Sequence, residues 1–238
     1  ENCEVGNAFG PFLYKNEKFL PRYYITPNSA LVVGDASQAK QQLIYCLIIQ
    51  SSEPKNIVFV QGTEINDYDL DFLTKFNYIF FVSGEVDPSN LDKLRAYESQ
   101  GGIIIPDILN EKNTITNEDV ALISNSTKGI LKEIKIGEFS HNKVALELNG
   151  EKGWLVASER FAYFPGWTAS INDNKVEIFG ANNAVSAVYL NGQKGKLVFE
   201  YKPKSYKNGK TISIITVIIL IAYFCYFIYK KKSSGDKN

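Results

Sequence analysis

The stretch Tyr78–Asp107, YIFFVSGEVDPSNLDKLRAYESQGGIIIPD, decides the fold because it contains a complete strand–helix–strand unit. Its first part, YIFFVSG, is a continuous apolar run that ends in Ser-Gly. Within residues 90–100, Leu91, Leu94 and Tyr97 recur at helical spacing. The closing run GGIIIPDI predicts a further strand. Apolar strands that alternate with helices are typical of a parallel sheet covered on both faces.

The same alternation extends upstream of this unit. ALVVGD (Ala30–Asp35) and NIVFVQG (Asn56–Gly62) are interpreted as buried strands. The segment between them, SQAKQQLIYCLIIQ (Ser37–Gln50), predicts a helix, and Asp69–Phe76 predicts a short one. We therefore expect a three-layer parallel α/β domain over residues 30–127.

The strand–helix–strand unit resembles the class I glutamine amidotransferase-like fold, with its apolar strand, its turn, its helix of the "L..Y...GG" kind and its next strand. In the active enzymes of that family, a cysteine nucleophile stands on a strand-to-helix elbow, with His and Glu later in the chain. Here no cysteine follows a predicted strand, Ser83 has no histidine partner in an evident motif, and His141 is the only histidine. No catalytic residue is assigned. The strand-end acids Asp35, Glu85 and Asp107 are interpreted as loop caps or a degenerate ligand crevice.

Residues 128–206 differ in character, because apolar and polar residues alternate as they do in half-buried strands. The predicted strands are residues 130–139, 143–150, 154–161, 167–173, 175–181, 184–190 and 196–202. Turns at Asp173-Asn174, Asn182-Asn183 and Asn191-Gly192 fit tight hairpins. Many short strands with this spacing imply an antiparallel β-sandwich. We expect residues 1–29 to add a strand to it.

The stretch FAYFPGW (161–167) places four aromatic residues around one Pro-Gly pair. Pro165 fixes φ and cannot donate to a strand ladder, while Gly166 permits an unusual backbone, so the pair predicts a turn between two strands. Three roles stay open for the aromatic side chains: a packed corner, a sugar-stacking platform, or a contact with lipid headgroups or a neighbouring membrane helix. The candidate binding residues are Tyr163, Phe164 and Trp167.

The run Thr211–Tyr229, TISIITVIILIAYFCYFIY, has 19 residues and no charge. At ~1.5 Å per residue it spans about 28 Å, close to the thickness of the hydrocarbon core of a bilayer. Aromatic residues crowd its C-terminal half, as they do at a membrane interface, and Lys230, Lys231 and Lys232 follow it. We expect a transmembrane helix in the cell membrane, followed by a cytoplasmic tail over residues 230–238.

Three features bear on the orientation of the chain in the membrane. Four lysines precede the apolar run and three follow it directly, so the positive-inside rule is nearly balanced. Asn125-Ser126-Thr127 is a glycosylation acceptor triplet. The sequence contains no Met, so residue 1 is not an initiator and an export signal can precede it. We expect an extracytoplasmic body; a tail-anchored protein with a cytosolic body is the alternative.

Composition excludes some classes of protein. A hydrophobic content of 45% and an aromatic content of 13% exclude a disordered chain. Nothing resembles the clustered basic face that nucleic acid requires, and no Cys/His spacing resembles a metal site. We expect neither a nucleic-acid partner nor a metal or other cofactor. Cys225 lies in the apolar run, and a disulfide between Cys3 and Cys46 stays open.

Residues 158–216 resemble the C-terminal end of YfhO-like membrane proteins, in which a "Y-P-G-W" corner leads through short strands to a last membrane helix. The matching positions are Phe164-Pro165-Gly166-Trp167, Asn172–Val176, Asn182–Val188, Gly195, Tyr201, Pro203, Ser205, Gly209 and Ser213, with Leu20-Pro21-Arg22 resembling the opening strand. The resemblance implies a polytopic protein related to membrane-embedded (GT-C type) glycosyltransferases that use lipid-phosphate sugars. Their catalytic acid is expected in an early loop that this chain lacks, so no catalytic residue carries over.

These features together lead to an expected function. We expect a noncatalytic, membrane-anchored extracytoplasmic module that positions an acceptor, a polymer or a partner protein near a glycosyltransferase-like membrane core. Its expected partners are the bilayer, membrane-embedded helices of the same or another protein, and a glycan or lipid-linked sugar. The alternatives are a cell-surface structural anchor or interaction protein, and a degenerate amidohydrolase.

Overall fold

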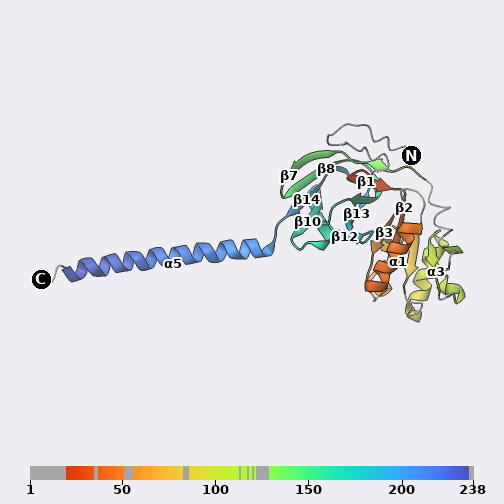
Figure 1. The fold of residues 1–238 in the computed structure, drawn as a ribbon, viewed down its shortest axis with the longest axis horizontal. Coiled ribbons are helices and arrows are strands. Elements are labelled where there is room, and N and C mark those ends of the chain that lie inside the picture. The colour runs from red at the N-terminus through yellow and green to blue at the C-terminus, as the bar shows by residue number, and fades with distance from the viewer. Residues whose placement is uncertain are drawn as a thin grey trace, which may run out of the picture.

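A β-rich body and one long helix make up the computed structural model of the chain (Figure 1). The structure describes residues 20–34, 37–50, 56–82, 86–112, 114–116, 118–119, 121 and 129–235. Its strands form two sheets, and helices cover part of the larger one. The α+β class expected from the sequence is thus confirmed.

The larger sheet has nine strands in the order β5-β4-β2-β3-β12-β13-β9-β1-β6. Its parallel part consists of β5 (Ile103–Ile105), β4 (Tyr78–Phe81), β2 (Asn28–Val33) and β3 (Ile57–Gln61). Its antiparallel part consists of β12 (Phe179–Ala181), β13 (Val185–Asn191), β9 (Lys152–Ala157), β1 (Tyr23–Thr26) and β6 (Lys132–Glu133). The two parts join where Ala181 pairs with Val60. The parallel and antiparallel regions that the sequence pattern separates therefore share one mixed sheet.

The smaller sheet is entirely antiparallel and has the order β11-β10-β14-β8-β7. Its strands are β11 (Asn174–Val176), β10 (Trp167–Ile171), β14 (Lys194–Tyr201), β8 (Lys143–Asn149) and β7 (Ile136–Ser140). It packs on the antiparallel part of the nine-stranded sheet. Leu146, Leu197 and Phe199 of the smaller sheet share a buried cluster with Leu155 and Val188 of the larger one.

The nine-stranded sheet is strongly curled. Only Pro27 separates β1 from β2 in the sequence, yet four strands lie between them in the sheet order. In a flat sheet with strands about 4.8 Å apart, β1 and β2 would be about 24 Å from each other. Two residues of extended chain span only about 7 Å. The sheet therefore bends until its parallel and antiparallel parts face each other across a common core.

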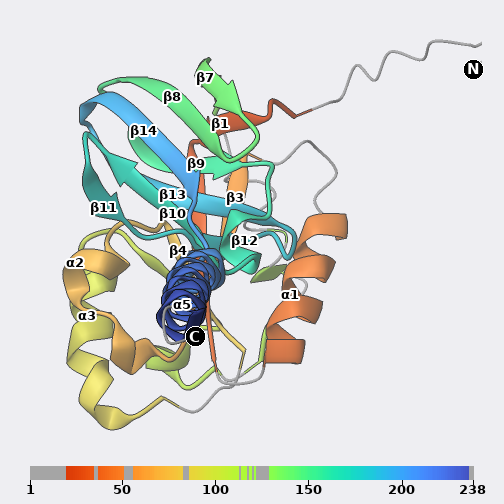
Figure 2. The same ribbon diagram turned by 90° about the vertical axis from the view of Figure 1, so that its left-hand side faces the viewer.

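The helices divide between the two faces of this sheet (Figure 2). The helices α2 (Leu70–Leu73) and α3 (Leu91–Ser99) pack on one face, where Leu73, Leu94 and Tyr97 join a buried cluster with Trp154. On the opposite face, α1 (Ser37–Gln50) covers the parallel strands. Short 3₁₀ helices occur at Ile65–Asp67 (η1), Pro88–Asn90 (η2), Ile108–Asn110 (η3) and Phe161–Tyr163 (η4).

Three details of the predicted β region were wrong. The continuous strand predicted over residues 130–139 is divided into β6 and β7, which belong to different sheets. The continuous strand predicted over residues 175–181 is divided into β11 and β12, which belong to different sheets. The chain crosses between the sheets at residues 177–178, and a period-two pattern carries no signal of such a crossing. The first predicted hairpin turn is shifted by one residue, because Asn172 and Asp173 adopt the positive φ values of 48° and 68°.

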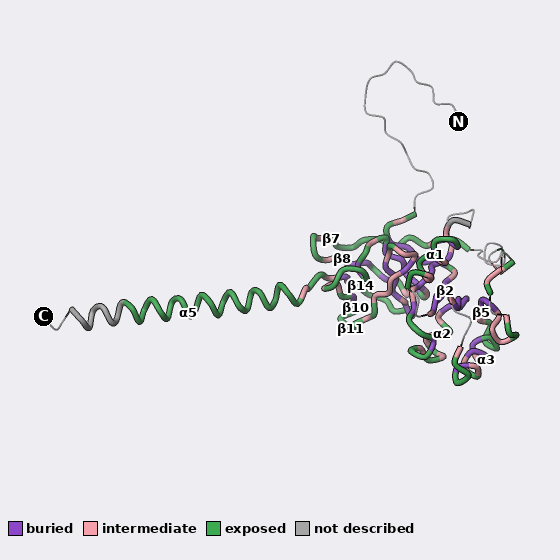
Figure 3. Tube along the Cα trace, turned by 60° about the horizontal axis from the view of Figure 1, so that its bottom comes forward, coloured by how far each residue is buried: buried purple, intermediate pink, exposed green. Residues whose placement is uncertain are grey.

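The C-terminal helix α5 (Lys204–Gly235) projects from the end of β14 (Figure 1). Its residues Lys204–Phe227 are long and apolar enough to cross a membrane, and none of its most apolar window is buried against the body (Figure 3). The hydroxyls of Thr211 and Thr216 donate to the carbonyl oxygens of Lys207 and Ile212. These two hydroxyls are thus satisfied within the helix, which suits an apolar environment. The predicted apolar run lies inside a helix that begins seven residues earlier.

A buried carboxylate stabilises the turn between β8 and β9. Glu151 is 7% exposed, and it accepts hydrogen bonds from the Asn149 N–H (2.6 Å) and the Lys132 ammonium (3.0 Å). Burial alone would raise the pKa of Glu151, but these hydrogen bonds and the positive charge of Lys132 outweigh it, so the pKa lies below its ordinary value. The carboxylate therefore ties the turn to β6 in its charged form.

We expect Glu151→Gln to lower the free energy of unfolding at pH 7 by about 1–2 kcal/mol. Because the folded pKa is depressed, this stabilisation is present above the ordinary carboxyl pKa of about 4.3 and is lost as the pH falls through the folded pKa. The substitution should therefore also weaken the acid dependence of stability. Urea unfolding of the full chain in detergent micelles between neutral and acidic pH measures both effects. Glu147→Gln on an exposed position of β8 is the control, and an equal loss in the two variants contradicts the assignment.

Candidate functional site

The FAYFPGW corner lies at the root of α5. Gly166 adopts φ +111°, and its carbonyl oxygen accepts a hydrogen bond of 2.7 Å from the Lys202 N–H. A Cβ at Gly166 would lie 2.9 Å from the Cα of Pro203 and 3.0 Å from the Tyr201 ring. Pro203 directly precedes the helix. The Pro-Gly turn is therefore packed against the last residues before α5, a contact that the sequence pattern did not predict.

A second turn reaches the same place. The Tyr201 N–H donates to the carbonyl oxygen of Asn142, in the turn between β7 and β8 that also carries His141. Figure 3 shows the strands of the smaller sheet at the helix end of the body. Two turns and the end of β14 thus hold the point where α5 leaves the body. We call this place, comprising Asn142, residues 163–167 and residues 201–203, the helix root.

The inner half of the corner closes the open end of the core between the two sheets. Phe161 is 6% exposed, and its ring stacks on Phe199 at a centroid distance of 4.6 Å. It also contacts Trp167 at 4.4 Å, and Trp167 contacts Tyr201 at 5.4 Å. These rings form a continuous series from the core to the root. Phe161, and in part Trp167, are therefore packing residues that form a corner of the core.

The outer half of the corner is exposed. Phe164 is 57% exposed and Tyr163 is 39% exposed. The Tyr163 hydroxyl donates to Oε1 of Gln61 at the end of β3 (3.2 Å), which fixes its ring over the junction between the parallel and antiparallel strands. Burial raises the pKa of Tyr163, and the nearby Arg160 opposes this shift. The hydroxyl is therefore neutral and acts as a donor rather than as an acid or a base.

Two shallow hollows flank Phe164 and Trp167. One, of about 310 Å³, extends towards Lys175 and Ile178. The other, of about 420 Å³, extends towards Glu159, Arg160 and Ala184. Both combine aromatic rings with exposed cationic side chains. Such surfaces fit flat or headgroup-like ligands better than an enclosed substrate.

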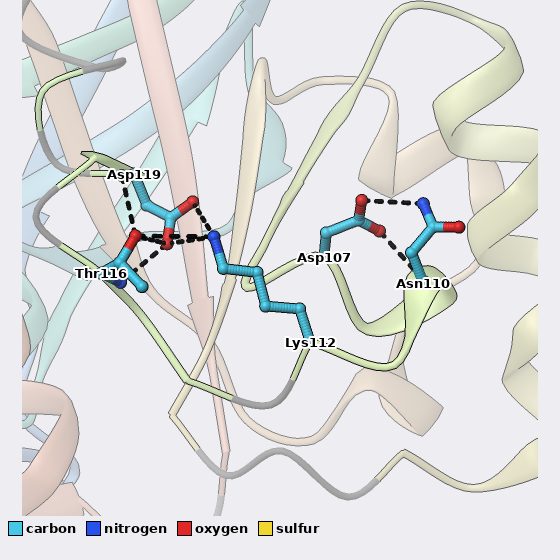
Figure 4. Close-up of polar contacts among 5 residues, drawn as sticks. All are labelled: Asp107, Asn110, Lys112, Thr116 and Asp119. Atoms are coloured by element: carbon cyan, nitrogen blue, oxygen red, sulfur yellow. Dashed lines mark hydrogen bonds and ion pairs between the residues drawn. The ribbon is translucent and has the colours of Figure 1, made fainter.

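The proposed strand-end crevice is described only in part. Asp35 and Glu85 lie outside the described residues, as does the glycosylation candidate Asn125. Asp107 caps η3: its carboxylate accepts from the Asn110 N–H (3.3 Å) and side-chain amide (2.8 Å) (Figure 4). This arrangement matches the cap interpretation of Asp107.

A neighbouring ion pair was missed from the sequence. The Lys112 ammonium contacts both Asp119 oxygens (2.8 and 2.9 Å), and Asp119 also accepts from the backbone and hydroxyl of Thr116 (Figure 4). Burial raises the pKa of Asp119, but the hydrogen bonds from Lys112 and Thr116 lower it overall. The T-x-x-D spacing was the available signal, since Thr and Asp three residues apart commonly exchange hydrogen bonds at a helix start. The cluster orders a loop and leaves no free acid or base.

In the described part of the chain, no residue is assigned to metal binding or to nucleophilic catalysis. No group of three or more His, Cys, Asp or Glu side chains there could hold a metal ion. His141 lies in an exposed turn of the smaller sheet, whereas Ser83, which lies outside the described residues, follows β4 of the larger sheet. The helix root is therefore the best-defined candidate site.

No family model matches the chain, and no curated protein or solved structure matches it either.

Proposed function

We propose that the chain is a noncatalytic, membrane-anchored module that holds an extracytoplasmic body against the bilayer. There it positions an acceptor, a polymer or a partner protein beside a glycosyltransferase-like membrane protein. The observation that carries this proposal is the construction of the helix root. Only Lys202 and Pro203 separate β14 from α5, and Gly166 packs on Pro203. Without a flexible linker, the bilayer position of α5 sets the position of the body.

The membrane part of the proposal is supported by α5 itself. An apolar helix of this length that packs against nothing in the described body would expose a large hydrophobic surface in water. At about 25 cal/mol per Å² of apolar surface, removal from water strongly favours the bilayer. The charges confined to both ends of the helix sequence fit the same location.

The positioning role is supported by two further features. Two of the described strand-end and loop acids, Asp107 and Asp119, are occupied by capping and ion pairing. Several residues of the root, including Gly166, Tyr201 and Pro203, are among the positions that carry the resemblance to the C-terminal region of YfhO-like proteins. The link to sugar transfer depends on that resemblance, and a cell-surface anchor without such a link is the second candidate.

A glycosyl-transfer assay in membranes of the native host distinguishes these two functions. The assay follows labelled sugar from a polyprenyl-phosphate donor into surface acceptors. We expect transfer to fall when residues 20–203 are deleted while α5 is kept, and to recover when the full chain is supplied. Equal transfer with and without the body contradicts the accessory role and favours a structural anchor.

A further inference from the structure

We infer that the helix root is a second membrane-contacting surface, which binds anionic phospholipid headgroups through Tyr163, Phe164 and the lysines at the start of α5. The inference rests on the proposed membrane span of α5. It goes beyond that span because the body itself then contacts the bilayer, in addition to its attachment through α5. Its consequence is a fixed orientation of the body relative to the membrane.

The first observation is where the exposed aromatic side chains gather. Tyr163, Phe164 and Tyr201 belong to the root, and Tyr206 (70% exposed) lies in the first turn of α5. Tyrosine beside a membrane span is suited to the interface between the headgroups and water, because its ring is apolar and its hydroxyl stays hydrated. Several exposed aromatic side chains at this point therefore fit the outer surface of a bilayer.

The second observation is the charge of the first two turns of α5. The segment KSYKNGK (204–210) carries Lys204, Lys207 and Lys210 and no acid. At 100° per residue, the three lysines fall within roughly 120° of the helix circumference. They form no ion pair within the described part of the chain. The sequence thus places three unpaired cations on one side of the segment that adjoins the apolar run.

Lys204 and Lys207, in the first turn of α5, oppose the helix dipole. The N-terminus of a helix carries partial positive charge, so each cation there costs roughly 0.3–1 kcal/mol when it has no counter-charge. The stability of α5 therefore does not explain them. Anionic phosphate groups at the membrane surface supply the missing counter-charge, at about 1 kcal/mol for each lysine.

The third observation is the depth at which the root lies. The apolar run begins at Thr211, seven residues after the start of α5, so the polar turns raise the root about 10 Å above the hydrocarbon core. The headgroup layer on each side is about 5–8 Å thick. Exposed rings at the root, and the cations Arg160 and Lys175 that line its hollows, are within reach of the outer headgroups.

The carboxylates near the root do not reverse this charge. Glu200 pairs with Lys202 (2.6 Å), and Glu159 pairs with Arg22 (2.5 Å). Asp173 and Glu177, which flank Lys175, are exposed and form no ion pair in the described part of the chain. Against these two acids stand Arg160, Lys175 and the three lysines of α5. The surface formed by the root, its flanking hollows and the first two turns of α5 is therefore cationic and attracts anionic headgroups.

Tryptophan quenching in nanodiscs tests the inference. The full chain is placed in bilayers of equal parts phosphatidylcholine and phosphatidylglycerol, with a spin label on either the headgroup or the middle of the acyl chain. Three exposed positions carry the probe: Phe164→Trp at the root, Lys194→Trp at the opposite end of β14, and Ile218→Trp in α5. The fluorescence of the unmodified chain is subtracted. We expect the headgroup label to quench Phe164→Trp but not Lys194→Trp, and the acyl-chain label to quench Ile218→Trp.

The outcomes separate the two proposals. Quenching of Ile218→Trp without quenching of Phe164→Trp overturns the docking surface and leaves the membrane span intact. Absence of quenching at Ile218→Trp overturns both. For the lysines, lipid selectivity is measured by the spin resonance of labelled phosphatidylglycerol and phosphatidylcholine. We expect each of Lys204→Gln, Lys207→Gln and Lys210→Gln to lower the preference for phosphatidylglycerol up to about fivefold, and Lys194→Gln to leave it unchanged. Equal preference in all four variants contradicts the role of the lysines.

Discussion

Replacement of Trp154 by alanine is expected to lower the free energy of unfolding by about 4 kcal/mol, the largest effect of any single change in the body. Trp154 is 1% exposed, on the face of the nine-stranded sheet that α2 and α3 cover. Its ring stacks on Phe76 at 4.7 Å and meets Phe179 and Tyr189 edge-on at 5.4 Å. The change therefore opens a large cavity where the curled sheet meets the segment after α2.

The indole N–H adds to this effect. It donates to the carbonyl oxygen of Lys75 (3.0 Å), which follows α2 and also accepts from the Ser29 hydroxyl (3.2 Å), so truncation removes one of the two hydrogen bonds to this acceptor. Trp154→Phe keeps much of the ring contact and loses the hydrogen bond, and should cost about 1–2 kcal/mol. Equilibrium denaturation of the full chain in micelles measures both. Equal losses in the two variants would show that packing around Trp154 is not the dominant contribution.

Gly166→Ala is expected to lower the free energy of unfolding by about 3 kcal/mol, through backbone strain and a clash at the helix root. At φ +111°, an L side chain is strained whatever the space around it. The new methyl group also meets the Cα of Pro203 at 2.9 Å, and this neighbour is backbone that cannot rotate away. The turn and the start of α5 must therefore separate.

Substitutions of two other glycines separate the contribution of backbone strain from that of the clash with Pro203. Gly101 has φ +90° and nothing within 4 Å of a built Cβ, so Gly101→Ala reports strain alone, at about 1–2 kcal/mol. Gly209 lies in α5 with no such neighbour and no positive φ, so Gly209→Ala should stay within about 1 kcal/mol of the unmodified chain. If Gly166→Ala cost no more than Gly101→Ala, the contact with Pro203 would have no role in holding the root together.

Most elements of the fold were predictable from local pattern. The bounds of α1 agree with the predicted helix Ser37–Gln50. The parallel pairing of β2, β3, β4 and β5 is the arrangement expected for apolar strands separated by helices. The apolar run within α5 has no polar face, which favoured a membrane span over a buried core helix. These elements depend on short-range periodicity, which sequence displays directly.

The joining of the two regions was not predictable in this way. It depends on the pairing of Ala181 with Val60 and on hydrogen bonds between Asn182 and the Phe59 backbone, all between residues far apart in the chain. The curl that brings β1 back to β2 likewise has no local signal. Both features involve contacts between residues distant in sequence: Val60, Ala181 and Trp154 share one buried cluster, and local pattern carries no signal of such contacts.

The candidate site was predictable in part. The sequence singled out Tyr163, Phe164 and Trp167, and it left open whether they pack, stack on sugar or meet lipid. The structure divides the corner into a packed half and an exposed half, because Phe161 turns into the core while Phe164 turns out. The contact of Gly166 with Pro203 required knowing that β10 pairs with β14, with Trp167 opposite Tyr201.

Thiol accessibility on intact cells tests the central claim, that α5 spans the bilayer and leaves the body outside, most directly. A Cys3→Ser variant retains Cys46, exposed on α1, and Cys225, within α5. With a membrane-impermeant maleimide, we expect Cys46 to react at once and Cys225 to react only after detergent is added. Reaction of Cys225 without detergent, or reaction of Cys46 only after the cells are opened, contradicts the account.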